Sequence, residues 1–307
     1  MGRKRASIDK WIKRRLKDEP PRSKSLIVTI FGDSVAPRLP GLWLSELISL
    51  LRPFGVNERL VRTSGFRLTG EGWLESKREG RRSRYSLTES GSHRVEHAYH
   101  RIYDPPPGQW DGNWTLVILN KALNTVGSRV ELRQELGWEG FGPLAPGVFL
   151  HPCADRAALG EVLERLGLSR TAVVMQACDL DAVSSCSAAT LVTQCWDLGL
   201  VADRYRRFLR SVKPVLPMLR GKLDPESAFV VQTLLIHSFR RVVLHDPRLP
   251  APLLPEDWPG HKAYALCREI YLRTYRQAED FLAAQLEDRE ALAANEGFMR
   301  RFGGLDR

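Results

Sequence analysis

The sequence lacks any run of roughly 18 or more apolar residues, so we expect no membrane-spanning helix. Its basic residues 1–17 lack the apolar core of a signal peptide, so we expect the protein to stay in the cytoplasm. Cysteine is scarce: the chain has five, and no two of them form a C-x-x-C pair. This number and spacing argue against a disulfide framework or a zinc knuckle, and we expect reduced thiols.

Motifs of the common enzyme classes are missing as well. The chain has no nucleophile elbow, no H-E-x-x-H, no kinase signature and neither of the two glycine-rich phosphate motifs. The glycines at 140–142 fit a nucleotide cradle or a turn, and the turn is favoured. His93, His97 and His100 share one helical face, but no cysteine or acidic residue stands where a further ligand is needed. We therefore expect no enzyme, no cofactor and no metal.

Positive charge is concentrated in the first third of the chain. Residues 1–103 hold 22 Lys and Arg against 11 Asp and Glu, whereas residues 104–307 hold 24 against 25. The excess that gives the net charge of +10 therefore belongs to the N-terminal part. A basic module joined to a near-neutral body predicts a head that binds a polyanion, and a body with a different task.

The first two segments of the head are a predicted helix and an apolar stretch of undecided secondary structure. Residues 8–17 have helical spacing and a basic face, and such a helix fits docking on the body, a membrane surface or DNA. Docking through Trp11 and Ile12 is favoured. Residues 25–35 are apolar and rich in β-branched side chains, which leaves both helix and strand open.

A helix-turn-helix follows. Residues 42–54 form an amphipathic helix, and Asn57 is a good N-cap for a second helix after a turn at Gly55. Residues 73–87 read as a hairpin whose tip is basic. A basic tip after an arginine-bearing helix is what a wing requires, since the helix enters the major groove and the tip reaches phosphates or the minor groove. The predicted DNA-binding residues are Asn57, Arg59, Arg62, Thr63, Arg67, Lys77, Arg78, Arg81, Arg82 and Arg84.

The body begins after a proline-rich linker that coincides with the charge boundary. Strands are predicted at 114–119, 148–150 and 171–177, separated by helices at 129–136 and 155–166. The order β-α-β-α-β is that of a small α+β sandwich. From residue 189 onward the pattern is largely helical and ends in a long helix at 262–286.

Eight short strings are spread over nearly the whole sequence: SLIVTIFGD (25–33), NERLVRTS (57–64), FRL (66–68), EGWL (71–74), GRRS (80–83), WEGFG (138–142), PGV (146–148) and LPEDWPG (254–260). Through these strings the chain resembles the phenylacetic-acid degradation operon repressors, the PaaX-like family of bacterial regulators. One departure is Gly65, where family members commonly carry an aliphatic residue; a glycine within a helix costs about 1 kcal/mol relative to alanine.

The resemblance implies a homodimeric repressor of phenylacetate (aromatic acid) catabolism genes that binds double-stranded operator DNA. It also implies release of the operator by phenylacetyl-CoA or a related acyl-CoA, and an α+β fold with a ferredoxin-like middle domain. The predicted parts are a basic arm (1–21), a winged-helix domain (22–103), a linker (104–112), the middle domain (113–185), a helical effector and dimerisation domain (186–286) and a tail prone to fray (287–307).

An acyl-CoA effector needs cations for its phosphates and an apolar slot for its acyl end. The body supplies both residue types. The effector-binding candidates are Phe141, Phe149, Arg204, Arg207, Arg240, Arg241, Trp258 and Tyr264.

Two other classes of protein stay open. A metal-dependent nuclease built on the ferredoxin-like domain would want carboxylate ligands at a strand end, whereas the first strand ends at Leu119-Asn120-Lys121. A constitutive architectural DNA-binding protein would need no large neutral body. Cleavage of DNA with Mg²⁺ or Mn²⁺ tests the first class, and DNA affinity with and without phenylacetyl-CoA tests the second.

Overall fold

The structure is a computed structural model that describes residues 2–36, 38–119, 126–179, 186–289, 292 and 295–306. By its internal contacts the chain divides into two compact units. The first unit comprises Met1–Pro105, Arg207–Val243 and Ala263–Arg307, and the second comprises Pro106–Arg206 and Leu244–Lys262. The first unit thus combines the predicted winged-helix head with helices from the predicted C-terminal domain, while the predicted domain limits stay predictions.

The N-terminal helix α1 (Gly2–Asp18) docks on the first unit. Ile8 and Trp11 are buried, and Trp11 Nε1 donates a hydrogen bond to the Ser211 carbonyl oxygen at 3.3 Å. This confirms that the apolar side of the helix is used for docking.

Residues 25–35, whose sequence fits both a helix and a strand, are helical. Helix α2 (Ser23–Ile30) continues directly into a π-helical turn (Phe31–Val35). All residues from Leu26 to Ile30 are buried, and α2 packs against helices α4 and α10, described below. Burial on every side of a helix outweighs the modest strand preference of β-branched residues, which is why the local sequence did not decide between the two.

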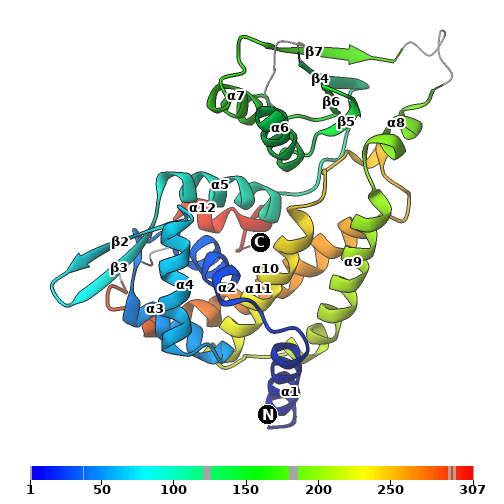
Figure 1. The fold of residues 1–307 in the computed structure, drawn as a ribbon. Helices are drawn as coiled ribbons and strands as arrows, with labels where there is room; N and C mark the ends of the chain where they lie inside the picture. The colour runs from blue at the N-terminus through cyan, green and yellow to red at the C-terminus, as the bar shows by residue number, and fades with distance from the viewer. Residues whose placement is uncertain are drawn as a thin grey trace. The chain divides into compact units, whose positions relative to one another are not determined.

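The winged helix is present as predicted (Figure 1). Residues predicted as one helix at 42–54 divide into a short strand, a helix and a 3₁₀ turn. The three strands form an antiparallel sheet in the order β1-β3-β2, with Leu74 opposite Leu87. The elements are β1 (Leu42–Trp43), α3 (Leu44–Leu51), the 3₁₀ turn Arg52–Phe54, α4 (Glu58–Gly70), β2 (Leu74–Glu79), β3 (Arg82–Leu87) and α5 (Glu89–Tyr103).

Two long helices follow later in the chain. Helix α10 (Pro225–Val243) is buried on nearly all sides and packs against α1, α2 and α5. Helix α11 (Pro259–Gln285) confirms the long helix predicted near the C-terminus. None of the helices in the described ranges is long and apolar enough to cross a membrane.

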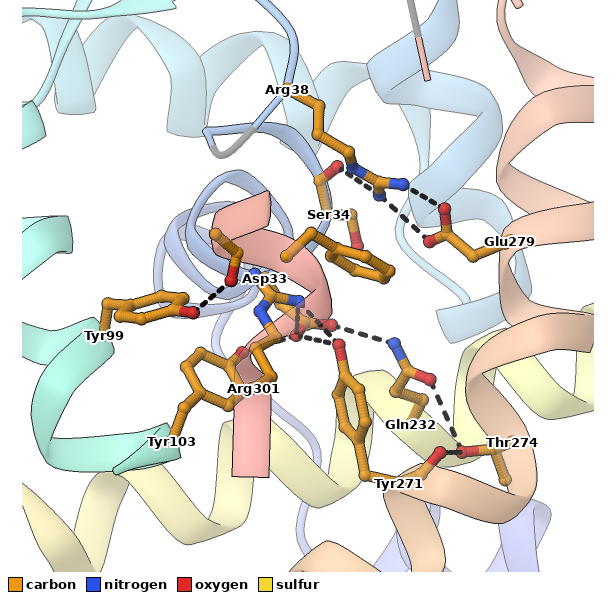
Figure 2. A network of polar contacts seen from close by, with 12 residues as sticks. Asp33, Ser34, Arg38, Tyr99, Tyr103, Gln232, Tyr271, Thr274, Glu279 and Arg301 are labelled. Atoms are coloured by element: carbon orange, nitrogen blue, oxygen red, sulfur yellow. Dashed lines mark hydrogen bonds and ion pairs between the residues drawn. The ribbon is translucent and has the colours of Figure 1, made fainter. Parts of the chain in front are cut away.

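A buried cluster of polar side chains ties the C-terminal residues into the first unit (Figure 2). The Asp33 carboxylate accepts a hydrogen bond from the Tyr103 hydroxyl at 2.5 Å, and bonds from the Tyr271 hydroxyl and Arg301 Nη1 at 3.1 Å each. Gln232 Nε2 donates to the same carboxylate at 3.2 Å. We call these five residues the Asp33 cluster.

The described part of residues 287–307 is folded against the first unit, while fraying of this tail stays a prediction. Helix α12 (Glu296–Met299) and a 3₁₀ turn (Arg301–Gly303) follow the long helix. Phe298 and Phe302 are buried together with Arg301. Arg301 pairs with a buried carboxylate 268 positions earlier in the chain, a partner that no local pattern reveals.

The second unit is built on a four-stranded antiparallel sheet in the order β5-β6-β4-β7. Val117 and Phe149 pack on two helices across one face of the sheet, and Trp114 and Leu150 pack on a third helix across the other. This confirms the predicted α+β class. The elements of this unit are β4 (Asn113–Leu119), α6 (Val126–Trp138), β5 (Gly142–Ala145), β6 (Val148–His151), α7 (Arg156–Arg165), β7 (Ala172–Cys178), α8 (Ala188–Cys195) and the 3₁₀ turn Ala251–Leu253. Helix α9 (Leu198–Val212) begins in this unit and ends in the first unit, where the 3₁₀ turn Lys213–Leu219 follows it.

Strand β5 was missing from the sequence prediction because its glycine and proline are typical of loops. It lies at the edge of the sheet, where Pro143 is tolerated. A Cβ added at Gly142 would lie 2.7 Å from Cys195 Cβ, and one at Gly140, whose φ is +90°, would lie 2.7 Å from the Pro247 carbonyl oxygen. These glycines allow close packing and a left-handed turn, in agreement with the turn interpretation.

Candidate nucleic-acid interface

Local sequence sets the start of α4. Gly55 adopts φ 75°, which lets the chain reverse after the 3₁₀ turn at the end of α3. The Asn57 side chain then accepts a hydrogen bond from the backbone N–H of Leu60 at 2.9 Å, and Glu58 stands in the first turn. An N-cap of this kind stabilises a helix by about 1 kcal/mol. Asn57 is thus a cap, and a role in DNA contact stays a prediction.

The inner face of α4 explains the glycine that departs from the family pattern. Val61, Ser64, Gly65 and Leu68 are buried. A Cβ added at Gly65 would lie 3.2 Å from the ring of Tyr85, which comes from β3. The aromatic ring therefore packs directly on the helix backbone and occupies the volume that a larger residue would fill. The glycine lets the recognition helix and the wing strand approach closely.

The outer face of α4 carries the predicted DNA-reading residues. Arg59, Arg62, Thr63 and Arg67 are all exposed and lie on the side opposite the buried stripe. Arg62 donates from Nε and Nη2 to Glu58 Oε1 at 2.9 and 2.7 Å. An exposed pair four residues apart is worth only about 0.3–0.5 kcal/mol, so Arg62 can exchange this partner for a base or a phosphate at little cost.

The hairpin of β2 and β3 forms the wing (Figure 1). Gly80 turns the chain with φ 61°. Lys77, Arg78 and Arg81 are exposed there, and Arg78 Nε donates to the Gly80 carbonyl oxygen at 3.1 Å. These three cations stand where a wing tip meets phosphates.

Arg82 is exposed like its neighbours, but it already has an ion-pair partner in the same chain. Its Nη1 and Nη2 donate to the two Glu287 carboxylate oxygens at 2.9 and 2.5 Å, and its guanidinium lies 4.1 Å from the centre of the Trp43 ring. Arg84 also lies over Trp43, at 5.5 Å. The hydrogen bond with Glu287 raises the pKa of Arg82, and the same bond lowers the pKa of Glu287. As DNA contacts, Arg82 and Arg84 stay predictions.

Sequence reasoning missed Trp43 and Glu287 as partners of the wing. Glu287 also donates its backbone N–H to Glu46 Oε1 at 3.0 Å, so the end of the long C-terminal helix is fixed beside α3. Residues this far apart in the chain share no local signal. Only an alignment of sequences or the tertiary structure reveals such a pair.

The aromatic effector candidates have structural partners. Phe141 and Phe149 belong to the hydrophobic core of the second unit. Trp258 is buried edge-on against Tyr205, with ring centres 5.9 Å apart. Tyr264 donates its hydroxyl to the Tyr103 carbonyl oxygen at 2.9 Å. Their role in effector binding stays a prediction.

The cationic effector candidates differ in how far they are exposed to solvent. Arg204 is half-buried, and Arg207 and Arg241 are exposed. Burial and the neighbouring Arg241 lower the pKa of Arg240 to about 10, and Arg240 Nη2 donates to Ser25 Oγ at 3.2 Å. Arg240 is therefore linked to α2 of the winged helix.

Two cavities in the described part of the chain have room for part of an effector, and neither is lined by a predicted effector residue. One, of about 480 Å³, lies in the first unit against Phe31, Val95 and Tyr99. The other, of about 450 Å³, lies in the second unit between β7 and α7. The first cavity borders the π-helical turn and α5, and Asn295 and Gly297 of the C-terminal segment complete its lining.

One histidine of the α5 face has a carboxylate neighbour. His100 Nδ1 lies 2.8 Å from Asp104 Oδ2. Among the residues that the structure describes, no group of three or more His, Cys, Asp or Glu side chains is placed to hold a metal ion. Asn120 and Lys121, which bear on the nuclease alternative, lie outside the described residues.

A helix-turn-helix with an arginine-bearing second helix and a basic wing defines the first unit as the DNA-binding part of a winged-helix regulator. Three family models match the chain: PaaX-like protein at residues 22–91, PaaX protein central Cas2-like domain at 107–187, and PaaX-like protein C-terminal domain at 196–284. The chain belongs to the PaaX-like family. This confirms the resemblance inferred from the sequence.

Individual relatives were also found. Transcriptional repressor PaaX of Escherichia coli (strain K12) is 37% identical over 306 residues, which cover 98% of this chain and 96% of that protein. Among solved structures, the uncharacterized protein Rv0674 from Mycobacterium tuberculosis is 26% identical, with a TM-score of 0.49 and coverage of 81% of this chain and 91% of that chain.

Proposed function

We propose that this protein is a DNA-binding transcriptional repressor of phenylacetate (aromatic acid) catabolism genes. The observation that carries the proposal is the outer face of α4, where Arg59, Arg62, Thr63 and Arg67 are exposed side by side. The major groove admits an α-helix, and arginines on such a helix can donate in bidentate fashion to guanine. The similarity to a relative that is named a transcriptional repressor supports the same function.

The proposed effector is phenylacetyl-CoA or a related acyl-CoA. The thioester offers phosphates to cations such as Arg207 and Arg241, whereas the free acid offers a single carboxylate. Release of DNA requires that the effector bind the DNA-free conformation more tightly than the DNA-bound one. By reciprocity, operator DNA must weaken effector binding by the same factor, about 5- to 150-fold for a coupling of about 1–3 kcal/mol.

The proposed active form is a homodimer. Strand β7 is an edge strand of the sheet in the second unit, and Val173, Val174 and Met175 expose 47%, 45% and 43% of their surface. Unpaired strand edges and exposed apolar side chains favour association. A second copy of the chain seated on β7 would cover both, and a dimer would present two copies of α4 to two half-sites.

The function is tested by binding to promoter DNA of a phenylacetate catabolism operon. Fluorescence anisotropy measures affinity for this duplex and for a scrambled duplex, each with phenylacetyl-CoA, CoA or phenylacetate. We expect a clear preference for the promoter duplex and a 5- to 150-fold loss of affinity with the thioester alone, matching about 1–3 kcal/mol of coupling.

Other results identify the competing classes. Equal affinity for both duplexes, unaffected by the thioester, indicates an architectural protein. Cleavage of either duplex after addition of Mg²⁺ or Mn²⁺ indicates a nuclease. Promoter preference with equal effects of the acid and the thioester leaves the repressor standing and refutes the acyl-CoA effector.

A further inference from the structure

Phe66 lies on the outer face of α4 with 78% of its surface exposed, more than any other large apolar side chain in the described parts of the chain. It cannot serve the core from this position, because Val61 and Leu68 already occupy the buried side of the same helix. Large apolar side chains that face water on an otherwise polar surface often mark a contact with another molecule. The question is which molecule this ring contacts.

The neighbours of Phe66 narrow the choice. Arg59, Arg62 and Thr63 precede it by seven, four and three positions, which places them on the same side of the helix, and Arg67 follows directly. The exposed ring therefore stands among three exposed cations. A partner that fits must offer negative charge at its edges and an apolar group between them.

The major groove of DNA has this chemistry. Phosphates line both rims, and the 5-methyl group of thymine is the apolar group displayed on the base edges. A phenyl ring has no hydrogen-bond donor for a phosphate and none for a guanine, so an apolar contact is what it can contribute. The arginines would make the polar contacts on either side.

We propose that Phe66 is a specificity-determining residue that reads the 5-methyl group of a thymine beside the bases contacted by the arginines of α4. The inference rests on the proposed function, because it requires sequence-specific DNA binding through this helix. Burial of the ring against the methyl group removes apolar surface from water on both partners. No counterion is released by this contact, so it adds selectivity without adding to the salt dependence of binding.

The test replaces thymine by uracil, which removes only the methyl group. The probe is the tightest-binding duplex that the wild-type protein selects from a random-sequence pool. Each thymine is changed in turn, and affinity is measured for the wild type, for Phe66→Ala and for Leu60→Ala. Leu60 is a matched control because it is an exposed apolar residue of the same helix, about a third of a turn away from Phe66.

For the wild type, we expect one thymine in each half-site at which uracil lowers affinity about fourfold, the factor for one buried methyl group. The same uracil should have no effect on Phe66→Ala and its full effect on Leu60→Ala. The salt dependence of Phe66→Ala should equal that of the wild type. Because Phe66 is exposed, the variant should keep the wild-type melting temperature, which is measured in parallel.

Several outcomes would overturn the inference. Selected duplexes without a recurrent thymine, or wild-type binding that ignores every uracil, would refute the methyl contact while leaving the repressor intact. Equal uracil sensitivity in Phe66→Ala and the wild type would assign the contact to another residue. A loss of DNA bending in Phe66→Ala without uracil sensitivity would make the ring a wedge between bases. Failure of the wild type to select any sequence would instead refute the proposed function.

Discussion

Replacing Arg301 by methionine tests whether the Asp33 cluster fixes the C-terminal segment. Methionine keeps much of the length of the side chain and removes the guanidinium that pairs with Asp33 at 3.1 Å. The side chains of Arg301 and Asp33 are 0% and 2% exposed, so the carboxylate is left in the interior without its cation. Removing one partner of a buried ion pair costs about 3–5 kcal/mol.

The lower end of that range is expected because other donors to Asp33 remain. Burial raises the pKa of Tyr103 and of Tyr271, so both hydroxyls stay protonated and continue to donate. Burial alone would lower the pKa of Arg301, but the neighbouring Asp33 carboxylate and the hydrogen bond with the Tyr271 hydroxyl outweigh it, and the pKa is raised above its usual value. Arg301 therefore keeps its positive charge in the wild type, and Arg301→Met should cost about 3 kcal/mol.

Urea unfolding measures the cost, with Asp33→Asn and the double variant completing a cycle. We expect the double variant to be more stable than the sum of the single effects predicts, by about 0.5–3 kcal/mol. Arg300→Met is the control, since that side chain is 72% exposed and its loss should matter by less than about 0.5 kcal/mol. Strictly additive effects, or a cost below about 1 kcal/mol for Arg301→Met, would refute the reasoning.

The remaining predictions concern the wing, the oligomer and pH. Arg81→Ala should weaken binding to all duplexes alike and lower the salt slope by about one. Arg82→Ala should change the salt slope less, because Glu287 already neutralises Arg82. Equal changes of the slope in the two variants would contradict this. Sedimentation with operator DNA should give two chains per duplex, with half-sites about one helical turn apart or a multiple of it, and a one-to-one complex at micromolar concentration would rule this out. Burial, with Arg240, Arg241 and Arg15 nearby, lowers the pKa of His237 to about 3, so the unfolded chain takes up a proton first as pH falls. Wild-type stability should therefore decline from about pH 6.5 toward 3, and a His237→Gln variant with the same decline would show that another group is responsible.

Elements with a strong local signal were predicted well from the sequence. Asn57, Thr88 and Asp155 are the N-caps of α4, α5 and α7, and each cap bond joins residues two or three positions apart. The hairpin turn at Gly80 is equally local. The recognition helix and the wing could be placed because their chemistry is written within a single stretch of chain.

Features that depend on distant contacts were not predictable. The helical state of residues 25–35 comes from burial against α4 and α10, and the order of the C-terminal segment comes from Arg301 meeting Asp33. Sequence alone also gave Arg82 the same role as Arg81, because its pairing with Glu287 spans 205 positions. The exposed arginines of α4 could be located because their positions follow from the spacing within one helix.

The central claim is that α4 reads base sequence. Affinities of the wild type, Arg62→Ala and Arg67→Ala for the selected duplex and a scrambled duplex test it directly, with Arg273→Ala on the surface of α11 as the control. Arg62→Ala or Arg67→Ala should cost about 1–3 kcal/mol on the selected duplex and less on the scrambled one, so that selectivity falls. Unchanged affinity of both helix variants for the selected duplex would contradict the account.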